Sequence, residues 1–115
     1  MSAAQASADE TYVAEAVSEH AARAENREQA FRVDVTRGRL EVASHAAAGA
    51  APGFELTLGL VAAGREGETL DVTPARTATA GNQIRVLREG LLEWFVNGPL
   101  GLEQGFELAE RPAGE

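Results

Sequence analysis

Two glutamates, Glu93 and Glu103, stand on either side of the segment that is densest in turn and aromatic residues. Paired carboxylates hydrolyse glycosidic bonds when one donates a proton and the other acts as base or nucleophile, at separations of at most about 10 Å. A turn at Asn97-Gly98-Pro99 would bring these two side chains toward each other. Because glutamate is the commonest charged residue of the chain, such a pair also arises by chance, and a glycosidase is the second alternative to a non-catalytic function.

The same segment carries the only Trp of the chain, with Phe95 beside it. Leu92, Trp94 and Val96 occupy alternate positions and therefore share one face of an extended strand. We expect this face in the core, because a Trp side chain buries a large apolar surface. Phe95 then projects from the opposite face, and we expect it to be half exposed and able to stack on a sugar or fill a pocket of a partner.

Two amides complete the set of candidate ligand-binding residues. Asn97 and Gln104 lie in the turn and shortly after it, where each could hydrogen-bond the turn or a ligand, and the turn is the preferred interpretation. Together with Trp94 and Phe95 they give the first alternative function. This is a carbohydrate-binding module in which Trp94 or Phe95 is the stacking surface.

Residue types that support other chemistries are few and dispersed. The chain has no Cys, which excludes disulfides, thiolate catalysis and thiolate metal sites. His20 and His45 have no acidic or second His neighbour at a ligand-like spacing. No serine lies in a Gly-x-Ser-x-Gly context, and no glycine-rich phosphate loop occurs. The sequence therefore predicts no catalytic residue, no metal site and no cofactor.

Length and charge limit the class of protein and its partners. A chain of 115 residues forms one domain with a single modest core. The net charge of -8 argues against nucleic acid, which binds basic surfaces, and leaves a protein or a glycan as the expected partner. No apolar run of about 18 residues occurs, so we expect no membrane insertion, and residues 1–5 lack the features of a signal peptide. The oligomeric state is left open.

Alternation of apolar and polar residues predicts an all-β, antiparallel, sandwich-like domain at residues 9–110, with flexible tails at 1–8 and 111–115. Residues 31–35 and 40–44 form a hairpin around Thr36-Arg37-Gly38-Arg39, a loop covers 44–53, and strands follow at 54–60, around Thr77 and Thr79, at 84–88 and in the Trp segment. The expected core residues are Phe31, Val33, Val35, Leu40, Val42, Phe54, Leu56, Leu58, Leu60, Ile84, Val86, Leu92, Trp94, Val96, Phe106 and Leu108.

The segment from Asp9 to Ala24 allows two structures. A capping-box pattern at residues 7–10 and apolar residues at helical spacing predict a short N-terminal helix. Residues 12–17 equally suit a short strand, and alanine discriminates poorly between the two.

The segment from Arg88 to Phe106 resembles a stretch in the N-terminal region of integrin-like FG-GAP or VCBS repeat surface proteins of myxobacteria. The most specific part is Glu-Trp-Phe-Val-Asn at 93–97 followed by Gly-Leu-Glu-Gln-Gly-Phe at 101–106, and weaker likeness covers residues 12 to 112. This resemblance implies a β-rich module that precedes repeat domains in an exported protein, with no activity to transfer to particular residues. It also favours strands over a helix between Tyr12 and Ala24.

These observations together predict a non-catalytic structural or interaction module of a bacterial surface or secreted protein, located at the cell surface or outside the cell.

Overall fold

The computed structural model describes residues 10–45, 53–66, 68–69 and 72–108. A single 3-10 turn, η1 (Glu10–Tyr12), precedes eleven strands. Five of them form one sheet in chain order: β1 (Glu15–Ser18), β2 (Ala21–Asn26), β3 (Phe31–Thr36), β4 (Arg39–Ser44) and β5 (Glu55–Gly59). Four form the second sheet, also in chain order: β8 (Pro74–Ala80), β9 (Gln83–Arg88), β10 (Leu91–Gly98) and β11 (Gly101–Leu108). The short strands β6 (Gly64–Arg65) and β7 (Glu68–Thr69) pair with each other.

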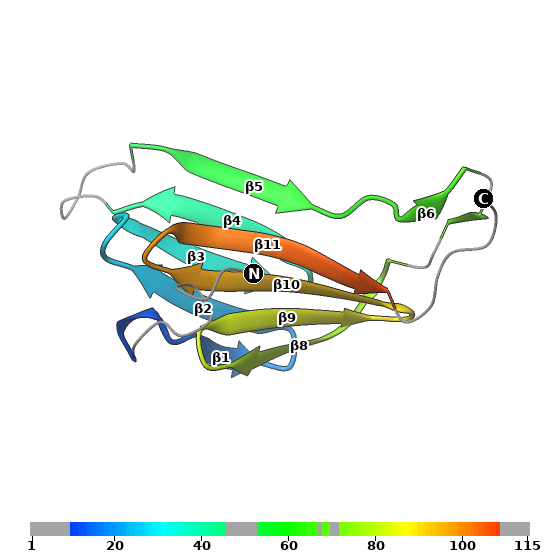
Figure 1. The fold of residues 1–115 in the computed structure, drawn as a ribbon, viewed down its shortest axis with the longest axis horizontal. Helices are drawn as coiled ribbons and strands as arrows, with labels where there is room; N and C mark the ends of the chain where they lie inside the picture. The colour runs from blue at the N-terminus through cyan, green and yellow to red at the C-terminus, as the bar shows by residue number, and fades with distance from the viewer. Residues whose placement is uncertain (1–9, 46–52, 67, 70–71, 109–115) are drawn as a thin grey trace.

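The predicted fold class is confirmed, because the two antiparallel sheets pack as a sandwich (Figure 1). The described part of the segment from Asp9 to Ala24 forms strands and not an α-helix. In β2 the buried residues are Ala22, Ala24 and Asn26, which is the period of two expected for a strand with one face in a core. The predicted tails at 1–8 and 111–115 lie outside the described residues, as do residues 46–52 of the predicted loop.

The predicted hairpin at residues 31–44 is confirmed as β3 and β4. Arg37 and Gly38 connect the strands with φ values of 49° and 76°. Positive φ at both central residues matches the twist of a two-residue hairpin, and glycine adopts it without steric cost. A side chain at position 38 would also meet Arg88 and Pro74 of the facing sheet, each at 2.7 Å from the added Cβ.

One side of the sandwich is joined by backbone hydrogen bonds between the two sheets. Strand β8 packs against β1 and β2. The Thr77 N–H donates to the Glu19 carbonyl at 2.7 Å, and the Ala14 N–H donates to the Gly81 carbonyl at 2.8 Å. Since both sheets run in chain order from this side, β5 and β11 are the edge strands at the opposite side, where β5 lies beyond β4 and β11 (Figure 1).

The core between the sheets is built mainly from small and β-branched side chains. The large residues expected there from β3, β4 and β9 are buried, which confirms that part of the prediction. Alanines of β2 and of the residues before β1 also belong to this core. The buried cluster contains Ala14, Ala22, Ala24, Phe31, Val33, Val35, Leu40, Val42, Ile84, Val86 and Phe95, with Leu102 packed against it.

The core prediction is wrong for the two strands of the open side. Phe54, Leu56 and Leu58 are 49%, 47% and 43% exposed, and Phe106 and Leu108 are 47% and 45% exposed. Leu60 is partly buried. The physical reason is the unequal number of strands. β11 is itself an edge strand, and a sheet of five described strands faces a sheet of four, so no described strand lies opposite β5.

Candidate functional site

The structure reverses the predicted faces of the Trp-containing strand. Phe95 lies on the inward face of β10 and is 1% exposed, so the prediction of a half-exposed Phe95 is wrong. Trp94 points to the outward face and is partly exposed, so its predicted place in the core is also wrong. Val96 is buried as predicted, although it shares the outward face with Trp94.

Trp94 covers the backbone of Gly105, its neighbour on β11. A Cβ at position 105 would lie 1.9 Å from Cζ2 of the Trp94 indole, so only glycine leaves room for the ring. An aromatic side chain on such a glycine shields the weak point that glycine makes in a strand. Trp94 therefore stabilises the hairpin of β10 and β11.

Gly105→Ala is expected to displace the Trp94 indole toward solvent, because the ring and the added methyl group would occupy the same space. The Trp94 emission maximum should shift to longer wavelength, and the free energy of unfolding should fall by about 1 kcal/mol. Gly59→Ala is the control, since a Cβ there meets nothing within 4 Å. Unchanged emission in Gly105→Ala would contradict this packing.

Asn97 belongs to a buried amide network that connects the sheets. Its Nδ2 donates to the carbonyls of Glu25, at 2.7 Å, and Tyr12, at 3.2 Å. Its Oδ1 accepts from Nδ2 of Asn26 at 2.9 Å, and its carbonyl accepts from Nδ2 of Asn82 at 2.8 Å. Buried amides that are satisfied in this way fix the position of the strands that carry them.

Arg88, Glu93 and Gln104 form a second polar cluster across β9, β10 and β11, in which Gln104 is exposed and the other two are buried. Arg88 Nη1 donates to Glu93 Oε1 at 2.8 Å, and Gln104 Nε2 donates to Glu93 Oε2 at 2.7 Å. Arg88 also donates to the carbonyls of Val72, at 2.7 Å, and Gly38, at 3.4 Å. Side chains of Arg88 and Glu93 are only 2% and 3% exposed, so this ion pair is part of the interior.

The structure does not bring the two candidate carboxylates together. Glu93 pairs in register with Phe106, and Glu103 pairs with Val96. Cross-strand partners share a face, so Glu93 is on the inward face of the sheet and Glu103 is on the outward face. A hairpin of β10 and β11 does separate them, but its turn lies at Pro99-Leu100, and Asn97 and Gly98 of the predicted turn belong to β10.

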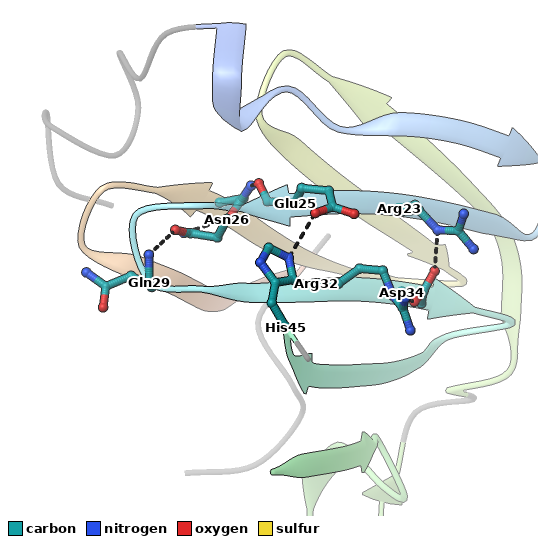
Figure 2. A network of polar contacts seen from close by, with 8 residues as sticks. Arg23, Glu25, Asn26, Gln29, Arg32, Asp34 and His45 are labelled. Atoms are coloured by element: carbon teal, nitrogen blue, oxygen red, sulfur yellow. Dashed lines mark hydrogen bonds and ion pairs between the residues drawn. The ribbon is translucent and has the colours of Figure 1, made fainter. Parts of the chain in front are cut away.

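A network of charged side chains covers the outward face of the five-stranded sheet (Figure 2). Asp34 accepts hydrogen bonds from Nε of Arg23 at 2.8 Å and Nε of Arg32 at 3.0 Å. The hydrogen bond from Arg23 to Asp34, followed by the charge of Asp34, raises the pKa of the Arg23 guanidinium. His45 lies 2.9 Å from Glu25 of β2, so this His has an acidic neighbour in space that its sequence position did not indicate.

In the parts of the chain that the structure describes, no group of three or more His, Cys, Asp or Glu side chains is arranged to hold a metal ion. Those same residues include no helix that is long and apolar enough to cross a membrane.

The best candidate site is the apolar surface of the open side. We call it the open-edge strip: Phe54, Leu56 and Leu58 from β5 and the residue before it, and Phe106 and Leu108 from β11. Register places Leu56 beside Val42 and Leu58 beside Leu40, and both partners are buried. The strip is therefore the uncovered continuation of the core. Sequence alternation identified its residues but assigned all of them to the interior.

No family model matches the sequence, and no curated protein or solved structure shows a significant match to it. The likeness to FG-GAP and VCBS repeat proteins therefore remains a prediction.

Proposed function

We propose that this domain is a non-catalytic interaction module that binds another protein through the open-edge strip, in a bacterial surface or secreted protein. The observation that carries this proposal is the exposure of the strip. Five large apolar side chains, each at least 43% exposed, lie on the edge strands β5 and β11 or next to them, at the same side of the sandwich. Exposed apolar residues that occur singly need no explanation, whereas a group of them marks interaction surfaces in soluble proteins.

The interior supports the same proposal, because the buried charged and amide side chains already make structural contacts within the domain. Arg88 and Glu93 form a buried ion pair, and Asn97 and Asn26 join the two sheets. A rigid scaffold with a mobile or exposed binding edge is a common arrangement in recognition modules.

The alternative functions have less support. Of the four residues considered for carbohydrate binding, only Trp94 lies on the outward face, where its ring covers Gly105. Phe95 and Asn97 are buried, and Gln104 binds Glu93 on the inward face. The glycosidase alternative requires cooperation between Glu93 and Glu103, which project from opposite faces of one sheet.

Site-specific photo-crosslinking tests the proposal in cells that produce the full chain. A photoreactive phenylalanine analogue at Phe106 or Leu56 is expected to give one discrete protein adduct. The matched control is the same analogue at Val17, which is 62% exposed and lies on β1, the opposite edge strand of the larger sheet. Absence of an adduct at both strip positions, or identical adducts from all three, would contradict the proposal.

A further inference from the structure

We infer that the free edge of β11 receives one extended strand from a partner protein, whose inward side chains are apolar and whose outward side chains are basic. This inference rests on the proposed function and specifies the kind of partner. It follows from the number of strands, from the backbone of β11 and from the charges around it.

Among the residues that the structure describes, the smaller sheet has no strand that covers β5. Its order is β11-β10-β9-β8, against β1 to β5 in the facing sheet, and β8 packs at the side of β1 and β2. A fifth strand beside β11 would therefore lie opposite β5, which extends past β11 in Figure 1. Strands within a sheet are about 4.8 Å apart and packed sheets about 10 Å apart, so one added strand spans this gap.

The backbone of β11 is suited to bind such a strand. β11 is an edge strand of eight residues that pairs with β10 along its full length. In an antiparallel pair, every second residue directs its N–H and C=O away from the partner strand. Half of the residues of β11 thus present main-chain groups at the free edge, which is the geometry that strand-addition complexes use.

The side chains around this edge define the chemistry of the added strand. Its inward residues would contact Leu56 and Leu58 of β5 and lie beside Phe106 of β11, so apolar residues suit these positions. Its outward residues would lie on the same face as Glu103 and Glu107. The whole chain carries a charge of -8, so basic residues complement the outward positions.

A second copy of this chain fits the edge less well than a single strand. If β11 paired with β11 of a second copy about a two-fold axis, the five-stranded sheets of the two copies would lie in one common layer. Because each larger sheet extends one strand beyond β11, β5 of each copy would overlap β4 of the other. The like charge of -8 on each copy opposes the same contact. The space opposite β5 therefore accommodates one added strand but not a second copy of the whole domain.

The test uses the full chain and a fluorescently labelled peptide of eight residues, the length of β11, in which valine alternates with lysine and threonine. The peptide is expected to bind saturably, and a peptide of the same composition with scrambled order is expected to bind at least about tenfold more weakly. Hydrogen exchange should show new protection at every second amide of β11. Binding without protection in β11, or equal binding of both peptides, would overturn the inference.

Two variants connect the binding to the stated side chains. Leu56→Ser should weaken binding by about tenfold, because a half-exposed Leu becomes covered in the complex, while Val17→Ser on the opposite edge should leave it unchanged. Glu107→Lys should weaken binding of the lysine-containing peptide by about threefold and strengthen binding of a glutamate-containing counterpart by a similar factor. Equal effects of Leu56→Ser and Val17→Ser, or unchanged preference in Glu107→Lys, would contradict the inference.

Failure of this inference and failure of the proposed function give different results. A discrete adduct at Phe106 without strand-like protection of β11 would retain an interaction module and exclude strand addition. A homodimeric adduct at Phe106 would identify a second copy as the occupant and overturn the inference.

Discussion

Phe95→Ala is expected to lower the free energy of unfolding by about 3 to 5 kcal/mol, the range for deleting a large aromatic side chain from a packed core. Phe95 is 1% exposed and belongs to the buried cluster between the sheets. Removing it leaves a cavity that the surrounding valines and alanines are too small to fill. Urea denaturation followed by far-ultraviolet circular dichroism measures the change.

Trp94→Ala is the matched control for Phe95→Ala, because it removes the neighbouring aromatic residue from the same strand. Trp94 is partly exposed and covers Gly105, so its loss should cost about 1 to 2 kcal/mol. A larger cost for Trp94→Ala than for Phe95→Ala would show that the outward face of β10 is the one that stabilises the domain.

Glu93→Ala is expected to lower the free energy of unfolding by about 3 to 5 kcal/mol, because it leaves the Arg88 cation buried without its carboxylate. Arg88 Nη1 and Glu93 Oε1 are 2.8 Å apart, and both side chains are almost fully enclosed. Replacing both residues, as in Arg88→Met with Glu93→Leu, should recover most of the loss, since no unpaired charge remains. Urea denaturation of these two variants and of the unmodified protein provides the measurement.

The exposed ion pairs on the outer face supply the control for the buried pair. Asp34→Ala removes the partner of Arg23 and Arg32, both about half exposed, and should lower the free energy of unfolding far less than Glu93→Ala. If Asp34→Ala and Glu93→Ala had equal effects, the buried position of the Arg88–Glu93 pair would have no energetic significance.

Strands such as β3, β4, β5 and β9 could be predicted from the sequence because each carries its own alternation and turn signals, whereas alanine-rich β1 and β2 also matched a helix. Gly38, Gly90 and Asn97-Gly98-Pro99 mark three of the hairpin connections. The inward face of β10 could not be predicted this way, because both faces of that strand contain large apolar residues. The face with Glu93 was assigned to solvent, yet this glutamate is buried by its pairing with Arg88, which comes from the preceding strand.

The candidate site depended on information that no single strand contains. Leu56 and Leu58 show the same alternation as Val33 and Val35, although the first pair is exposed and the second is fully buried. The difference is the position of each strand in its sheet and the number of strands opposite it. The contact between His45 and Glu25 was missed for a similar reason, since it joins Glu25 of β2 to the residue that follows β4.

Both main sheets are meanders, in which every described strand pairs with the strand that precedes or follows it in the chain. Each hairpin therefore closes a short loop at low entropic cost, and only the meeting of the two meanders requires long-range closure. We therefore expect the two halves to assemble locally before they dock, and the amide contact between Asn26 and Asn97, 71 residues apart, to form at the docking step. The polar clusters would then select one alignment of the two sheets.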